Sequence, residues 1–284
     1  DDRLVSTSNA GAVVDAYGTK PFAGSYGFDA PVEDGGEEVV SLSGSNDTIM
    51  QEAQAAGKAV GIINSGFIAE PGTGVFLADV DNRGETEEIT AEILAQLPNV
   101  ILGAGETDYL PEGTVGVFGE EGTRTDGRNL IEEAEAAGYT VVFNREELMA
   151  VDPNSTERLL GIFAAEDTYN DLFEDELRRD GFVDENGDLI LYGQPPLNPN
   201  PPTVAEMLEV ALPILDADPD GFFLVLEEEA TDNFGNDNNA AGTIEAAIRA
   251  DEAIGVALDF VDNTDPNTLV ITAADSDAGG LEVD

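Results

Sequence analysis

Amphipathic segments and short apolar runs rich in β-branched residues alternate along the chain from about residue 47 onward. The helical spacing of apolar positions predicts helices, and the short runs predict buried strands. The predicted helices are Asp47–Ala56, Thr86–Leu97 with Thr86 as its N-cap, Gly127–Gly138, Thr203–Leu215 and Ala240–Phe260. The predicted strands are Ala59–Ile63, Val100–Leu102, Thr140–Phe143, Leu159–Phe163, Phe222–Leu226 and Thr268–Ala273. Strands separated by such helices require right-handed crossovers, so we predict a three-layer α/β/α fold with a mainly parallel central sheet.

One stretch interrupts this alternation. Asp184–Gly187 predicts a hairpin turn, and the proline-rich run Gln194–Pro202 predicts a loop. The hydrophobic fraction of 42% is enough for a substantial core. We therefore predict a single α/β domain over residues 1–284, with an irregular excursion at about residues 165–202.

The charge balance is strongly acidic, with 60 acidic against 11 basic residues and a net charge of −49. Such a charge opposes compaction unless salt screens it or bound cations neutralise part of it. We therefore expect divalent cations as partners and a halophilic, high-salt setting. Nucleic acid is not an expected partner, because the chain has no basic patch of useful length to neutralise phosphates.

The chain contains neither cysteine nor histidine. A metal site must then be built from oxygen donors, which favours calcium or magnesium, with manganese also suited and zinc less so. No apolar run is long enough for membrane insertion, and Asp1-Asp2-Arg3 does not begin a signal peptide. The chain is therefore expected to be a mature or internal sequence.

Polar loops follow three of the predicted strands, at the strand ends where open parallel sheets bind ligands. The candidate metal ligands in these loops are oxygen donors: Glu70 and Thr73 after the first strand, Glu227, Asp232 and Asn236 after the fifth, and Asp275 and Ser276 after the last. Any one loop could be a solvated acidic turn in an acidic protein. Three such loops at one edge of a sheet favour a shared metal site.

Five phrases in the chain resemble, in the same order, segments of the alkaline phosphatase family. They are Gly18–Asp29 (GTKPFAGSYGFD), Leu160–Ala164 (LGIFA), Pro202–Met207 (PTVAEM), Gly221–Glu227 (GFFLVLE) and Asn267–Thr272 (NTLVIT). The resemblance covers nearly the whole chain and implies a metal-dependent phosphoester hydrolase that acts on small phosphate esters. It also implies export to the periplasm or the extracellular space, and a homodimer.

The resemblance also implies roles for individual residues. Glu227, Asp232 and Asp275 fall on metal-binding carboxylates, and Arg83 falls on the arginine that clamps the phosphate. Ser8 falls on the nucleophile and Thr7 on an aspartate of the family. A threonine nucleophile at Thr7 remains an alternative, and so does Ser8 as a helix N-cap.

Departures from the family pattern shift the expected metal. Asn236 and Ser276 stand where the family has zinc-binding histidines, which favours oxygen-preferring ions. A metal-binding threonine of the family aligns with Gly72, one residue before Thr73. The family's N-terminal strand with its bridging carboxylate and a last C-terminal ligand have no counterpart in residues 1–284. The fold is therefore expected to be incomplete at both ends, as in a fragment or a shortened relative.

Two further interpretations accompany the phosphatase prediction. Asp216–Glu227 matches the spacing of an EF-hand loop, although Phe222–Leu226 is more typical of a buried strand than of a second helix. The alternative function is a secreted, acidic, cation-binding or structural protein that keeps the phosphatase fold without catalysis. The absence of histidine and the missing ligands favour that alternative.

Overall fold

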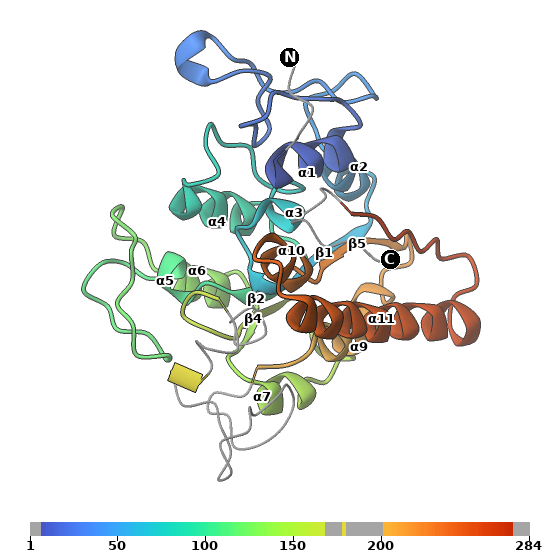
Figure 1. The fold of residues 1–284 in the computed structure, drawn as a ribbon. Coiled ribbons are helices and arrows are strands. Elements are labelled where there is room, and N and C mark those ends of the chain that lie inside the picture. Colours follow the sequence, from blue (N-terminus) through green and yellow to red (C-terminus); the bar gives the residue numbers. More distant parts are fainter. Residues whose placement is uncertain (1–6, 168–177, 180–200, 275–284) are drawn as a thin grey trace.

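A parallel sheet forms the centre of the chain (Figure 1). The structure is a computed structural model and describes residues 7–167, 178–179 and 201–274. Within these residues the sheet has five strands in the order β3-β4-β2-β1-β5. Their bounds are β1 Ala59–Phe67, β2 Val100–Ala104, β3 Thr140–Val142, β4 Leu159–Ile162 and β5 Phe222–Glu227. Every pair of neighbouring strands is parallel, as the alternation of helices and strands predicted.

Helices cover both faces of the sheet and form the outer two of three layers (Figure 1). The longer helices are α1 Ser8–Tyr17, α2 Ile49–Ala55, α4 Thr86–Ala95, α6 Leu130–Ala136, α9 Val204–Leu215, α10 Ala230–Asn236 and α11 Ala240–Asn263. The shorter ones are α3 Pro71–Gly74, α5 Glu106–Tyr109, α7 Arg145–Met149 and the 3₁₀ turn Val32–Asp34. The three-layer α/β/α prediction is thus confirmed.

Alternating residues of each strand belong to two separate cores. In β1, Val60 and Ile62 belong to a core with residues of α1, α2 and α4, whereas Ala59 and Ile63 belong to a core with residues of α9 and α11. Successive side chains of a strand point to opposite faces, so a strand covered on both sides is apolar at nearly every position. This is why these strands appear in the sequence as continuous apolar runs.

The predicted helices form with small differences at their ends. Thr48 and Thr203 each cap a helix in a reciprocal capping box, with Gln51 in α2 and with Glu206 in α9. The prediction of Thr86 as an N-cap is wrong. Glu85 precedes the helix with φ −85° and ψ 53°, and Thr86 is already the first helical residue of α4.

The last predicted strand is not observed. Residues Thr268–Ala273 have no regular structure, and Leu269 and Ile271 are 79% and 76% exposed. β5 is the edge strand of the described sheet and pairs only with β1 there, and residues 268–273 form no ladder with its open side. β-branched composition alone does not make a strand without a neighbour to pair with.

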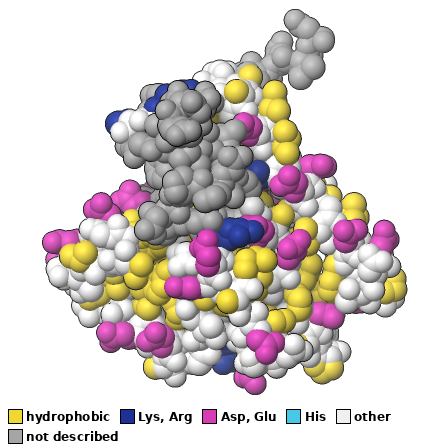
Figure 2. Space-filling view, turned by 90° about the horizontal axis from the view of Figure 1, so that it is seen from below, with side chains coloured by type: hydrophobic (Ala, Val, Ile, Leu, Met, Phe, Trp, Pro, Cys, Tyr) yellow, Lys and Arg dark blue, Asp and Glu magenta, His cyan; other side chains and the backbone are white. Residues whose placement is uncertain are grey.

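The surface matches the composition. Figure 2 shows acidic side chains spread among apolar ones on one face, with few basic side chains between them. No helix of the described residues is long and apolar enough to cross a membrane. The turn predicted at Asp184–Gly187, and most of the excursion at about residues 165–202, lie outside the described residues.

Candidate metal and phosphate site

The carboxyl ends of β1 and β5 bring Asn64 and Glu227 side by side. The two residues are register partners in neighbouring parallel strands, so their side chains leave the sheet on the same side. The Asn64 amide Nδ2 donates to Glu227 Oε2 at 2.8 Å and to Thr73 Oγ1 at 3.2 Å. The Asn64 amide therefore contacts two predicted metal ligands, Glu227 and Thr73, which come from different loops.

The loop after β1 closes against the Glu227 carboxylate. A Cβ built on Gly72 would overlap the carboxylate oxygens of Glu227, so this position requires a glycine if Glu227 keeps its place. Thr73 is fully buried, and its hydroxyl also lies 3.4 Å from the carbonyl oxygen of Ile68. The backbone of the loop after β1 thus packs closely against the Glu227 carboxylate, and this region is not an exposed acidic turn.

Glu70 and Arg83, thirteen residues apart, form an ion pair in the same region. The side chains are 27% and 43% exposed, so the guanidinium remains open to solvent. Beneath them Tyr26 is fully buried and donates from its hydroxyl to the carbonyl oxygen of Ala69 at 2.9 Å. Burial raises the pKa of the Tyr26 phenol, and the nearby carboxylates of Glu70 and Glu227 raise it further while Arg83 opposes them.

The two nucleophile candidates stand at the start of α1. Thr7 is the N-cap position, and its hydroxyl donates to the carbonyl oxygen of Ala23. Ser8 is the first helical residue and half-buried, and its hydroxyl makes no hydrogen bond among the described residues. Asn9 is buried and donates to the carbonyl oxygen of Ser25 at 2.5 Å, which anchors this turn. The N-cap position thus belongs to Thr7, and the alternative interpretation of Ser8 as an N-cap is wrong.

The loop after β5 turns directly into α10. Asp232 lies half-buried inside that helix, whereas Asn236 ends it and is exposed. Glu228 is 8% exposed and forms a buried ion pair with Arg249 of α11, with Nη2 to Oε1 at 2.9 Å. The backbone N–H of Glu229 donates to Ser65 Oγ at 2.9 Å. The turn contains Glu227 and Asp232, and these bonds attach it to β1 and to α11.

The structure describes some of the predicted metal ligands and not others. Asp275 and Ser276 lie outside the described residues. Among the residues that are described, no three acidic side chains converge as a complete metal site. Glu227, Thr73 and Asn64 are brought into contact, Glu70 pairs with Arg83, and Asn236 stands apart at the surface.

The EF-hand interpretation of Asp216–Glu227 does not apply. Asp216 ends α9, and residues Phe222–Glu227 form strand β5 rather than leading into a second helix. Asp218 instead closes the turn, because its carboxylate accepts the N–H of Asp220 at 2.9 Å.

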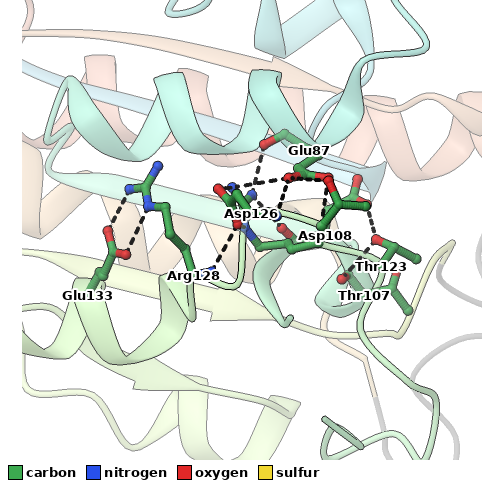
Figure 3. A network of polar contacts seen from close by, with 9 residues as sticks. Glu87, Thr107, Asp108, Thr123, Asp126, Arg128 and Glu133 are labelled. Carbon is green, nitrogen blue, oxygen red and sulfur yellow. Dashed lines mark hydrogen bonds and ion pairs between the residues drawn. The ribbon is translucent and has the colours of Figure 1, made fainter. Parts of the chain in front are cut away.

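An open hollow of about 1090 Å³ extends from Phe67 and Glu70 along α4 to the segment around Arg124. Arg124 is 1% exposed, and its Nε donates to Asp126 at 3.1 Å while Nη1 donates to the carbonyl oxygens of Glu87 and Asp108. Figure 3 shows the acidic side chains of this network beside α4, with Arg128 and Glu133 paired at one end. Two of the carboxylates that line the hollow, Glu87 and Asp126, already accept hydrogen bonds from backbone N–H groups or from arginine.

The sequence assigned Asn64 no role, brought in Gly72 only as the position aligned with a metal-binding threonine of the family, and did not reveal the buried pair of Glu228 and Arg249. One signal was present for Asn64, because a buried strand of apolar residues ends there in a polar amide. The contact of Gly72 with Glu227 and the ion pair carried no such signal, because both depend on contacts between segments far apart in sequence.

Comparison with known proteins decides the family. The sequence profile of the family described as alkaline phosphatase matches residues 1–283. This chain belongs to the alkaline phosphatase family. It is 28% identical over 296 residues to the repressible alkaline phosphatase of Saccharomyces cerevisiae, covering 99% of this chain and 46% of the yeast protein. It is 27% identical over 291 residues to the alkaline phosphatase of Escherichia coli, covering 95% of this chain and 58% of that protein.

Solved structures of the alkaline phosphatase family share the fold. The crystal structure of Thermus thermophilus alkaline phosphatase matches with a TM-score of 0.69 at 26% identity, over 92% of this chain and 46% of that one. The alkaline phosphatase of the Antarctic bacterium TAB5 matches with a TM-score of 0.66 at 19% identity, over 92% of this chain and 63% of that one. The chain spans about half the length of the curated relatives it matches.

The donors that this alkaline phosphatase family chain offers suit a hard cation. The side chains assembled at the carboxyl ends of β1 and β5 present carboxylate and hydroxyl oxygens, and the chain has no histidine or thiolate to add. Gly72 leaves the Glu227 carboxylate the space that any larger residue would occupy. Such a set fits magnesium or calcium better than zinc.

Proposed function

We propose that this chain is a metal-dependent phosphoester hydrolase that uses Ser8 as its nucleophile. The observation that carries the proposal is the contact between Glu227, at the end of β5, and the loop after β1 that contains Thr73 and Gly72. That edge is where a parallel sheet places its ligands, and the resemblance to the family implies metal-binding roles for residues of these loops.

Ser8 is the better nucleophile of the two candidates. Its hydroxyl makes no hydrogen bond to any residue that the structure describes, whereas Thr7 already donates to a backbone carbonyl. The N–H groups of that turn and the helix dipole favour negative charge beside Ser8. In the proposed step Ser8 Oγ bonds to phosphorus as the bond to the leaving oxygen breaks. The Ser8 proton is lost to solvent and the leaving alkoxide takes up another, and water then hydrolyses the phosphoserine.

Arg83 is proposed to hold the phosphate. Its planar fork can donate two parallel hydrogen bonds to a phosphoryl group, a task that an ammonium performs less well. In the structure it donates to Glu70, so phosphate must compete with that carboxylate. The exposure of the guanidinium leaves it accessible for this exchange.

Glu227, Asp232 and Asp275 are proposed to hold the divalent cations, with Glu70, Thr73, Asn236 and Ser276 as further oxygen donors. When bound, such cations would polarise the phosphoryl oxygens and lower the pKa of a hydroxyl or a water. Magnesium or calcium is the proposed ion, in keeping with the oxygen donors. One TAB5 alkaline phosphatase variant that shares the fold, with a TM-score of 0.63, is described with magnesium bound.

The proposal is tested by hydrolysis of a chromogenic phosphomonoester and a phosphodiester in molar salt, with Mg²⁺, Ca²⁺, Mn²⁺ or Zn²⁺ supplied singly. We expect turnover that a chelator abolishes and that one of the oxygen-preferring ions restores. Ser8→Ala should abolish the activity and Thr7→Ala should retain it. Turnover that survives in Ser8→Ala but not in Thr7→Ala would transfer the nucleophile to Thr7, and no turnover with any ion would remove the proposed activity.

The setting and assembly of the protein are also proposals. Small phosphate esters, export and a homodimer follow from family membership, and a salt-rich environment follows from the net charge of −49. Light scattering of the chain at several salt concentrations tests the dimer and the salt requirement together. A monomer at every concentration would contradict the dimer.

A further inference from the structure

Asn64 has every polar atom of its side chain engaged. Its side chain is fully buried within β1, where Asn64 is the register partner of Glu227. Nδ2 donates to Glu227 Oε2 at 2.8 Å and to Thr73 Oγ1 at 3.2 Å, and Oδ1 accepts the backbone N–H of Gly66 at 2.8 Å. A buried amide without such partners would be destabilising, so the native bonds hold the side chain in one orientation.

Two neighbours restrict the Glu227 carboxylate. Asn64 donates to Oε2, and the backbone at Gly72 lies so close that a Cβ there would overlap the carboxylate. The carboxylate is therefore held in one orientation.

We propose that Asn64 is a positioning residue for Glu227, aligning its carboxylate for a divalent cation and joining it to the Thr73 hydroxyl. This inference rests on the proposed function, in which Glu227 is a metal ligand. Donors that lie behind a metal ligand change metal affinity by about 10- to 100-fold when they are removed. Asn64 does not touch substrate or metal in this assignment. It acts through Glu227.

The test uses the full chain and Mn²⁺ alone as the probe, with the free ion counted by electron paramagnetic resonance. Roughly molar KCl screens the acidic surface, so that diffuse binding to exposed carboxylates is suppressed. Asn64→Asp keeps the acceptor for Gly66 but removes both donors and places a second carboxylate against Glu227. We expect it to weaken the Mn²⁺ affinity about 10-fold or more.

Asn99→Asp is the matched control. Asn99 lies immediately before β2, its Oδ1 accepts the N–H of Val60 at 3.1 Å, and its Nδ2 contacts only the carbonyl oxygen of Glu157 at 3.4 Å. The same substitution there also keeps an acceptor and removes a donor, but away from Glu227. It should leave the Mn²⁺ affinity unchanged.

A merely structural role for Asn64 is separated by thermal unfolding without metal. The exchange variant Asn64→Asp/Glu227→Gln restores one hydrogen bond with donor and acceptor reversed, so it should recover the unfolding temperature but not the Mn²⁺ affinity. If Asn64→Asp does not fold, Asn64→Ser removes the amide without adding charge and should show the same loss of affinity.

The outcomes distinguish the inference from the proposed function. Loss of Mn²⁺ binding in Glu227→Gln together with wild-type binding in Asn64→Asp and Asn64→Ser would overturn the role of Asn64 and leave the metal ligand in place. Wild-type binding in Glu227→Gln would remove Glu227 as a ligand and the inference with it. A lower unfolding temperature in the Asn64 variants with unchanged Mn²⁺ affinity would assign Asn64 a structural role only.

Discussion

Glu228 and Arg249 form a buried ion pair between the end of β5 and the middle of α11, with both side chains less than a tenth exposed. Glu228 directly follows the candidate ligand Glu227, so the pair ties the site to the longest helix of the described chain. Burial raises the pKa of the Glu228 carboxyl, and the Arg249 guanidinium opposes that rise. The ion pair thus anchors the loop after β5. The attraction between the two charges is offset in part by the free energy needed to remove both from water.

Breaking this pair should destabilise the fold. We expect Arg249→Met to lower the free energy of unfolding by about 3–5 kcal/mol, because it leaves the Glu228 carboxylate buried without its cation. The double variant Glu228→Gln/Arg249→Met should recover most of the loss. Urea denaturation at fixed salt measures both.

An exposed pair provides the control for that measurement. Arg128 and Glu133 are each 43% exposed and are joined by hydrogen bonds of 2.6 Å and 2.9 Å. Arg128→Met should change the free energy of unfolding by less than about 1 kcal/mol. Equal losses in Arg128→Met and Arg249→Met would contradict the importance of burial.

Gly72→Ala should disturb the Glu227 carboxylate directly. The added Cβ would overlap the Glu227 carboxylate, so that carboxylate must move. We expect a loss of about 1–3 kcal/mol in the free energy of unfolding and a weaker Mn²⁺ affinity. Gly255→Ala is the matched control, because a Cβ there meets nothing within 4 Å and the residue lies inside α11. It should stabilise the chain by about 0.5–1 kcal/mol, and a stable Gly72→Ala with native Mn²⁺ affinity would show that Glu227 tolerates displacement.

Asp79 makes stability depend on pH. Burial raises the pKa of the Asp79 carboxyl from 3.8 to about 6, although the hydrogen bond from the Tyr17 hydroxyl lowers it. Because the folded state holds this proton more tightly, the stabilisation is complete below pH 3.8 and is lost as the pH rises through about 6. The difference corresponds to at most roughly 3 kcal/mol.

Asp79→Asn should therefore stabilise the chain at pH 7 and give no advantage near pH 4. The asparagine carries no charge to desolvate and can still accept from Tyr17. Thermal unfolding across this pH range at constant salt measures the effect, with the exposed Glu33→Gln as the control. Parallel pH profiles for wild type and Asp79→Asn would contradict the raised pKa.

Arg83→Ala should weaken phosphate binding with little effect on the stability of the fold. The ion pair with Glu70 is partly exposed, so its loss should change the free energy of unfolding by less than about 1 kcal/mol. If Arg83 holds the phosphate, kcat/KM should fall about 10- to 100-fold, as expected from losing charge-assisted hydrogen bonds of about 1.5–3 kcal/mol. Inhibition by inorganic phosphate should weaken with it. Unchanged phosphate inhibition would remove Arg83 from the binding role, and Arg128→Ala controls for the loss of a surface arginine.

The sequence was sufficient for the architecture because the signals for it are local. Strands that are buried on both faces must be apolar throughout, and capping residues such as Thr48 and Thr203 mark where helices begin. The strand that the sequence predicted at Thr268–Ala273 failed for the opposite reason. Its composition is that of a strand, but strand formation requires a partner that local composition does not supply.

The sequence by itself therefore determined the α/β class, the absence of nitrogen and thiolate ligands, and the loops in which oxygen donors gather. Only the tertiary structure decided which of these donors meet. In the folded chain the register of β1 and β5 brings Asn64 beside Glu227. The backbone at Gly72 packs closely against the Glu227 carboxylate, and Arg83 pairs with Glu70. These relationships join residues distant in the chain, and their energies arise from burial and contact rather than from any local pattern.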